Sequence, residues 1–115
     1  MLLPQHWMRA ENISTVSILA AGRNGVMTVL RLNIINEKGL HARASARFVE
    51  VVEEFDATAQ VTRDGMTVPG DSIMGLLMLA ASRGTTIEVE TGGPQADELG
   101  LALTALVADR FGEDR

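Results

Sequence analysis

The residues best suited to chemistry lie in the stretch GLHARASARF, residues 39–48. Gly39 permits a sharp turn, and a helix is expected to begin just after His41. The first turn of a helix leaves N–H groups unpaired and carries a partial positive charge, which together stabilise a phosphate or carboxylate. Arg43 adds a guanidinium that can bind two phosphoryl oxygens at once. This arrangement suits a histidine that receives a phosphoryl group on a ring nitrogen.

Other roles for His41 compete with this one. It is the only histidine after residue 6, and no Asp or Glu stands at ligand spacing beside it, so no metal site is expected. Ser45 follows on the same helix, but the pair lacks an obvious orienting carboxylate and oxyanion hole, which argues against a hydrolase. A helix-capping or surface histidine is the plainest alternative. The residue types alone leave that alternative open.

Composition limits the remaining classes of function. The chain has 115 residues, of which 46% are hydrophobic and 22% charged, as expected for one globular domain. It has no cysteine, which excludes disulfides, thiolate catalysis and cysteine-based zinc sites, and fits a cytoplasmic location. The net charge of −5 and the lack of a dense basic cluster argue against nucleic-acid binding. No apolar run approaches the roughly 20 residues that a membrane span needs.

Residues 1–26 differ from the rest because they show no sustained periodicity. A secretory signal is disfavoured, since Ser14, Thr15 and Ser17 dilute the short apolar stretch. We expect either a flexible N-terminal extension or an upstream start assigned to a gene that begins near Val26 or Met27. His6 receives no role. Residues 27–115 are expected to form the folded domain.

Hydrophobic periodicity predicts the elements of that domain. Alternation predicts strands at residues 29–35, on both sides of the Asp64-Gly65 turn, and at residues 85–91. Helical spacing predicts amphipathic helices over residues 42–55 and from Pro94 to about Phe111. A nearly all-apolar helix, largely buried and with Leu76, Leu79 and Ala80 in the core, is expected over residues 73–82. Asp71 or Ser72 would be its N-cap and Gly84 its C-cap. The order βαββαβα predicts an α+β sandwich with helices on a single side of the sheet.

The segment GLHARASARF strongly resembles the active-site segment of HPr, the histidine-containing phosphocarrier of the bacterial phosphotransferase system. A second stretch, DSIMGLLMLAASRGTTIEVETGGPQADEL, is similar to the family's second helix, fourth strand and third-helix start. The resemblance covers about residues 27–111. It implies an open-faced sandwich in which three helices cover one face of a four-stranded antiparallel sheet.

The resemblance also implies a function. His41 would be phosphorylated at Nδ1 and Arg43 would steady the phosphoryl group. Enzyme I would donate the group, ultimately from phosphoenolpyruvate, and a IIA-type protein would accept it. Such proteins are monomeric cytoplasmic carriers rather than enzymes, and need no cofactor. Ala44 stands where many sugar-branch members have proline. With this alanine and with LLML in the second helix, the sequence resembles the nitrogen-related, regulatory branch of the family.

Two further predictions concern the second helix. By resemblance, Ser72 matches a serine that an HPr kinase/phosphorylase phosphorylates in some bacteria, although an ordinary N-cap explains it equally well. Ile73, Met74 and Leu77 are candidates for an exposed apolar patch that docks partners, although most such residues are core.

An alternative function belongs to a different class of protein. The chain could be a small regulatory binding module in which His41 has no role in phosphoryl transfer.

Overall fold

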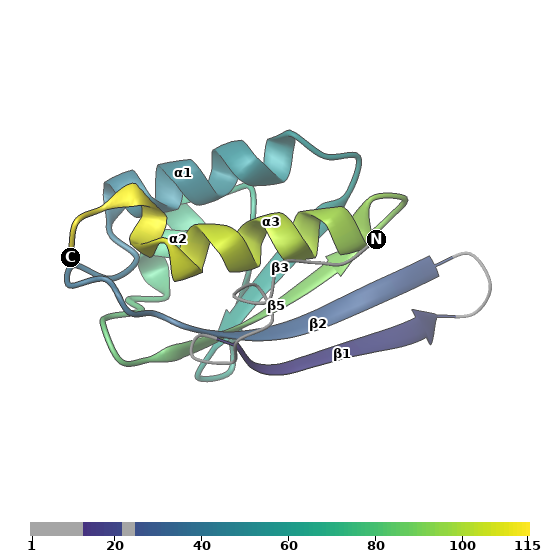
Figure 1. The fold of residues 1–115 in the computed structure, drawn as a ribbon, viewed down its shortest axis with the longest axis horizontal. Coiled ribbons are helices and arrows are strands. Elements are labelled where there is room, and N and C mark those ends of the chain that lie inside the picture. Colours follow the sequence, from purple (N-terminus) through teal and green to yellow (C-terminus); the bar gives the residue numbers. More distant parts are fainter. Residues whose placement is uncertain (1–12, 22–24) are drawn as a thin grey trace.

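The computed structural model describes residues 13–21 and 25–115 (Figure 1). All strands pair antiparallel in the order β1-β2-β5-β3-β4. Along the chain the elements are β1 (Ile13–Ala21), β2 (Gly25–Asn33), α1 (Ala42–Glu53), β3 (Thr58–Arg63), β4 (Met66–Pro69), α2 (Ile73–Met78), β5 (Thr86–Gly92), α3 (Ala96–Ala108) and the short turn η2 (Arg110–Gly112).

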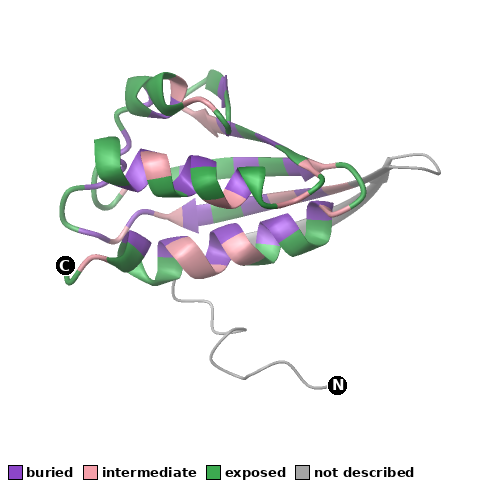
Figure 2. Cartoon of the chain, turned by 90° about the horizontal axis from the view of Figure 1, so that it is seen from above, coloured by how far each residue is buried: buried purple, intermediate pink, exposed green. Residues whose placement is uncertain are grey.

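The predicted fold class is confirmed. Strands β2, β5, β3 and β4 form the expected four-stranded antiparallel sheet, and the three helices lie on one face of it (Figure 1). In this layer α1 packs against both α2 and α3 (Figure 2). None of the helices in the described ranges has the length and apolar character that crossing a membrane requires.

The N-terminal extension contributes a fifth strand that the sequence did not predict. Strand β1 pairs with β2 along the edge of the sheet, in a register that places Ile13 opposite Leu32 and Ala21 opposite Gly25. Strand β2 itself begins two residues before the expected domain start at residue 27. Residues 1–12 and 22–24, with His6 among them, lie outside the described residues. The division at residue 26 stays a prediction.

The core lies between the sheet and the helices, as the alternation predicts. Leu32 of β2 and Ile87 of β5 are fully buried and lie opposite each other in the register. Phe48 of α1 and Leu103 of α3 are fully buried on the helix side. Figure 2 shows the corresponding stripes of buried positions along both long helices. Burial of these apolar side chains is the main force that fixes α1 over the sheet.

Helix α1 begins where it was predicted but ends at Glu53 rather than at residue 55. Its buried positions include Val49. Val51 and Phe55 also belong to the apolar stripe that helical spacing predicts over residues 42–55, but they are only partly buried. The early end explains the difference at Phe55, because a side chain outside the helix no longer follows the helical face.

Helix α2 is shorter than the prediction. It ends at Met78, and Ala80 adopts a left-handed conformation with φ of 52°. This turn directs Ala80 to the exterior, so its assignment to the core was wrong, whereas Leu76 and Leu79 are buried as expected. The Arg63 guanidinium donates to the Leu79 carbonyl at 2.9 Å and helps to end the helix.

Gly84 was predicted to be the C-cap of α2, and this prediction was wrong, because Leu79 occupies that position. It lies in the turn before β5 with φ of 89°, and its N–H donates to the carbonyl of Ile34 at 2.8 Å. The Asp64-Gly65 turn is confirmed, because both residues have positive φ, 52° and 80°, between the paired Arg63 and Met66.

The left-handed Ala80 leads to a stability prediction. A Cβ in this region costs about 1–2 kcal/mol, and glycine removes that cost while adding freedom to the unfolded chain. Ala80→Gly should therefore raise the free energy of unfolding by about 0.5–1 kcal/mol, measured by chemical denaturation. Ala102→Gly, in the interior of α3, should instead lower it by about 1 kcal/mol. Equal losses in both variants would contradict the prediction.

The C-terminal helix ends earlier than predicted, at Ala108 instead of Phe111, and it begins after Pro94, at Ala96. Arg110, Phe111 and Gly112 then have φ of 55°, 55° and 81°, so the chain makes a left-handed turn. Phe111 is fully buried at this turn. The turn carries the last residues of the chain back beside the start of α1 (Figure 1).

Candidate functional site

The loop before α1 is fixed by its contacts with the segment that follows α2. Gly39 has φ of 66°, and a Cβ at this position would lie 2.6 Å from the Ala81 carbonyl oxygen. The Leu40 N–H donates to that same carbonyl at 2.9 Å. Only glycine satisfies both the backbone conformation and the close approach. The turn that was predicted from Gly39 therefore determines where His41 stands.

Helix α1 begins directly after His41, as predicted, so His41 occupies the N-cap position. Its backbone is extended, its side chain makes no capping bond, and its carbonyl accepts from the Ser45 N–H at 2.8 Å. The N–H groups of Ala42, Arg43 and Ala44 precede that first bond and have no carbonyl partner within the helix. The imidazole is 27% exposed. The ring is therefore accessible at the positive end of a helix of 12 residues.

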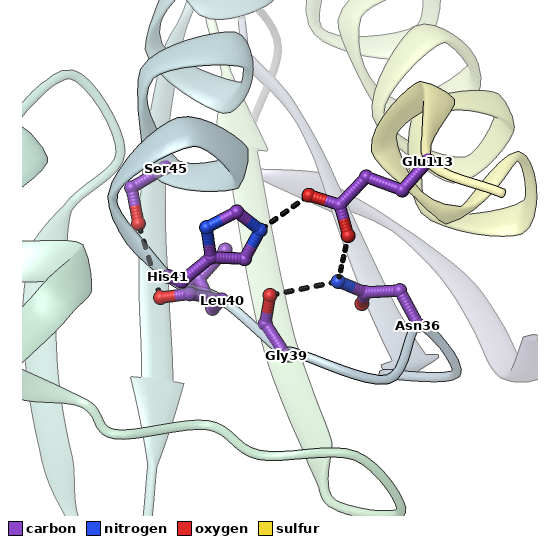
Figure 3. A network of polar contacts seen from close by, with 6 residues as sticks. All are labelled: Asn36, Gly39, Leu40, His41, Ser45 and Glu113. Carbon is purple, nitrogen blue, oxygen red and sulfur yellow. Dashed lines mark hydrogen bonds and ion pairs between the residues drawn. The ribbon is translucent and has the colours of Figure 1, made fainter. Parts of the chain in front are cut away.

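A carboxylate from the other end of the chain contacts this ring. Nε2 of His41 pairs with Oε2 of Glu113, and Oε1 of Glu113 accepts from Nδ2 of Asn36 at 2.9 Å (Figure 3). The same Nδ2 donates to the Gly39 carbonyl at 2.8 Å. Figure 3 shows Nδ1 on the opposite side of the ring from Glu113. Sequence reasoning found no orienting carboxylate near His41, whereas the fold supplies one.

The charge state of Glu113 follows from these contacts. Partial burial by itself would raise the pKa of Glu113. Hydrogen bonds from Asn36 and His41, together with the positive charge of Lys38 and that of the His41 ring when it is protonated, outweigh burial, so the pKa of Glu113 is lowered from its ordinary value. Glu113 is therefore ionised at neutral pH, and an ionised carboxylate can only accept hydrogen bonds.

Arg43 is exposed in the first turn of α1, beside an open hollow of about 340 Å³. Lys38 and Arg47 also line this hollow, and residues 112–115 close its other side. The hollow carries mixed charge, because the carboxylates of Glu37, Glu113 and Asp114 line it together with these cations. Of the cations, Arg43 lies in the same first helical turn that follows His41, and its guanidinium suits the oxygens of a phosphoryl group.

Ser45 does not contribute to the chemistry of the site. It is fully buried, and its hydroxyl donates to the Leu40 carbonyl at 3.3 Å. A nucleophilic serine would need its hydroxyl on the histidine and open to a substrate. The orienting Glu113 therefore does not revive the hydrolase interpretation.

The predicted apolar patch lies on α2, which packs against α1. Ile73, Met74 and Leu77 are 40%, 70% and 36% exposed, so this helix is not buried on most sides as its composition had suggested. Met78, at 63%, extends the patch and was not predicted. Four large apolar side chains on so short a helix are more than isolated surface residues would explain.

Ser72 is the N-cap of α2. Its Oγ accepts from the Gly75 N–H at 3.0 Å, and the side chain is only partly exposed. Of the two predicted caps, Asp71 and Ser72, the serine makes the bond. This contact accounts for a serine at this position without a kinase.

Glu113 and Asn36 are the site residues that sequence reasoning missed. Asn36 lies in the short polar segment between the predicted first strand and Gly39, and Glu113 follows the last periodic helix. Separations of 77 residues between them, and 72 between Glu113 and His41, leave no local pattern to detect. One sequence feature hints that the end of the chain packs on the domain. Residue 111 is a phenylalanine, a residue type that is commonly buried.

A family model described as the phosphorylation site of the HPr component of the phosphotransferase system matches residues 28–109. Phosphocarrier protein HPr of Cupriavidus necator is 49% identical over 80 residues, which cover 70% of this chain and 90% of that protein. Phosphocarrier protein NPr of Escherichia coli is 39% identical over 90 residues, which cover 76% of this chain and 100% of that protein.

Solved structures agree with these matches. HPr-C-His from Thermoanaerobacter tengcongensis has a TM-score of 0.72 and 33% identity, over 76% of this chain and 98% of that one. HPr from Bacillus anthracis has a TM-score of 0.68 and 38% identity, and the match covers 70% of this chain and 96% of that one. The chain belongs to the HPr family of phosphocarrier proteins of the phosphotransferase system. Members of this family are phosphoryl carriers rather than enzymes.

Proposed function

We propose that His41 accepts a phosphoryl group on Nδ1 from an Enzyme I-type protein and passes it to a IIA-type protein. The observation that carries this proposal is an accessible imidazole at the N-terminus of α1 whose Nε2 is occupied by Glu113 (Figure 3). Among the described residues none hydrogen-bonds to Nδ1. This nitrogen is therefore the one available for transfer.

The proposed transfer uses the first turn of α1. The Nδ1 lone pair attacks the phosphorus of a phosphohistidine on the donor, the new N–P bond forms, and the donor's N–P bond breaks with its electron pair returning to the donor imidazole. Arg43 and the unpaired N–H groups stabilise the phosphoryl oxygens during this step. In the second transfer the roles are reversed. The acceptor attacks the phosphorus, and the bond between phosphorus and Nδ1 of His41 breaks with its electron pair returning to Nδ1.

We assign this carrier to a regulatory, nitrogen-related relay that operates in the cytoplasm as a monomer. Ala44 in place of the common proline, and LLML in α2, support this assignment. Both NPr and HPr proteins are among the relatives, with HPr of Cupriavidus necator the more similar of the two described above. Comparison of phosphoryl transfer to a nitrogen-type and a sugar-type IIA protein tests the assignment. Preference for the sugar-type acceptor would contradict it, and a dimer in sedimentation would contradict the monomer.

The primary test is incubation of the full chain with an Enzyme I-type protein and phosphoenolpyruvate. We expect a mass gain of one phosphoryl group that acid removes and mild base preserves. Omission of Enzyme I should abolish the gain. A chain that stays unmodified with Enzyme I proteins of both the sugar and the nitrogen systems would contradict the proposal.

The apolar patch of α2 is proposed as the docking surface. Met74→Glu should slow phosphoryl uptake about tenfold or more, because losing a hot-spot side chain costs about 2 kcal/mol or more of binding free energy and about 1.4 kcal/mol already corresponds to tenfold. Since Met74 is 70% exposed, the variant should keep the wild-type stability. Leu101→Glu on α3, where the side chain is 43% exposed, is the matched control and should transfer normally. Unfolding of Met74→Glu, or equal rates in both variants, would contradict the assignment.

Ser72 is proposed as a second, regulatory phosphorylation site for an HPr kinase/phosphorylase. A phosphate at this N-cap adds about two negative charges beside the docking surface and should slow uptake from Enzyme I. Incubation with such a kinase and magnesium ATP, followed by mass mapping, should place the phosphate on Ser72, and Ser72→Ala should remain unlabelled. Absence of label on Ser72 would contradict this proposal.

A further inference from the structure

The C-terminal turn holds a conformation that local preferences oppose. Arg110 and Phe111 both have φ of 55°, and each non-glycine residue in this region costs about 1–2 kcal/mol. Such conformations persist where surrounding contacts determine them, often at functional sites. Here the fully buried Phe111 supplies the anchoring contact. The result of the turn is that Glu113 reaches the ring of His41.

Asn36 fixes the orientation of the Glu113 carboxylate. Its Nδ2 donates both to the Gly39 carbonyl and to Oε1 of Glu113, at 2.8 and 2.9 Å. Both partners are acceptors, so the amide cannot be flipped without losing both bonds. The orientation leaves the buried Oδ1 of Asn36 without a partner among the described residues. Because an unpaired buried acceptor is costly, the retained arrangement indicates that Nδ2 is held as a donor to Glu113.

The proton on the ring follows from this arrangement. Glu113 is ionised and can only accept, so the hydrogen bond to Oε2 requires that Nε2 carry the proton. A neutral imidazole with its proton on Nε2 has its lone pair on Nδ1 (Figure 3). The carboxylate thus selects the tautomer that can attack phosphorus.

We infer that Glu113 is a positioning residue for phosphoryl transfer, which it supports by holding His41 in the Nε2–H tautomer and fixing the ring with Nδ1 outward. The inference rests on the proposed function. When Nδ1 bonds to phosphorus and the donor's N–P bond breaks, the ring becomes an imidazolium whose proton stays on Nε2. The Glu113 carboxylate balances that charge, and no proton has to leave during the transfer.

Two substitutions separate this role from simple packing. In Glu113→Gln the Oε1 atom must accept from Asn36, because Nδ2 remains a donor. The new amide NH₂ then faces Nε2 of His41 and donates to it, which favours the opposite tautomer, with the proton on Nδ1. Glu113→Ala removes the bias without reversing it. A packing role predicts that the isosteric glutamine is the milder change, whereas tautomer control predicts that it is the more harmful one.

The experiment measures tautomer and transfer on the same full-length proteins. Imidazole ¹⁵N NMR is recorded at about pH 8.5, roughly two units above the ordinary histidine pKa. Uptake from Enzyme I and phosphoenolpyruvate is then timed. We expect Nε2–H in the wild type, a mixture in Glu113→Ala and a shift toward Nδ1–H in Glu113→Gln. Uptake should fall in the same order, by about 10- to 100-fold in the glutamine variant, the loss typical of a missing orienting partner.

Glu90 on β5 provides the matched control. It is exposed, and Glu90→Gln and Glu90→Ala make the same changes in charge and size. Both should behave as wild type. Uptake by Glu113→Gln equal to or faster than by Glu113→Ala, or an unchanged tautomer in Glu113→Gln, would overturn the inference. Failure of the wild type to take up phosphate would instead overturn the proposed function, and the tautomer measurement would still decide the role of Glu113.

Discussion

Replacing His41 with glutamine is expected to abolish phosphoryl uptake completely while the fold survives. Glutamine has no nitrogen lone pair that can attack phosphorus, so the loss is chemical and not a matter of degree. The imidazole is only partly buried and makes no capping bond. The free energy of unfolding should therefore change by no more than about 1 kcal/mol. Mass spectrometry after incubation with Enzyme I and phosphoenolpyruvate measures the uptake, and thermal unfolding measures the stability.

The chain contains its own control for this substitution. Its other histidine, His6, was given no role, so His6→Gln should take up one phosphoryl group at the wild-type rate. Residual acid-labile phosphate in His41→Gln would show that another residue accepts it. Loss of labelling in His6→Gln alone would transfer the assignment to His6.

The largest expected effect on stability comes from Phe111→Ala. Phe111 is fully buried and anchors the left-handed turn that follows α3. Its removal should lower the free energy of unfolding by about 3–5 kcal/mol, through lost burial and the remaining cavity. Since small domains are stable by only about 5–15 kcal/mol, the variant should be near the limit of folding. Urea denaturation at equilibrium measures the difference.

Phe55→Ala is the comparison for Phe111→Ala. Phe55 is only partly buried against the core, so the same truncation should cost clearly less. A loss below about 1 kcal/mol in Phe111→Ala would show that the C-terminal turn packs loosely. In that case the placement of Glu113 beside His41 would lose its structural basis.

Sequence patterns predicted the elements whose positions depend on local periodicity or on turn chemistry. Alternation predicted the strand at residues 29–35, and its alternating apolar residues Leu30, Leu32 and Ile34 are all buried. The Asp64-Gly65 pair identified the hairpin because few residues accept positive φ. His41 and Arg43 were singled out because a turn glycine and a helix start are both local features, and the resemblance to the HPr family supplied their predicted roles. These predictions needed no knowledge of tertiary contacts.

The features that were missed depend on tertiary contacts. The nearly all-apolar composition of α2 suggested burial on most sides, and the end of the helix before Ala80 exposes a residue that was assigned to the interior. Strand β1 forms where no periodicity was recognised, because β2 offers it an open edge. Glu113 meets His41 only after α3 and the left-handed turn have packed. A pairing across 72 residues has no signature in a single sequence.

The most direct test is to locate the phosphorus atom in the phosphorylated wild-type protein. The chain, labelled with ¹⁵N in its histidine rings, is phosphorylated by Enzyme I and phosphoenolpyruvate and examined by NMR for coupling between phosphorus and nitrogen. Coupling to Nδ1 of His41, with the proton retained on Nε2, is the expected result. A phosphorus atom on Nε2 of His41, or on any other residue, would contradict the account.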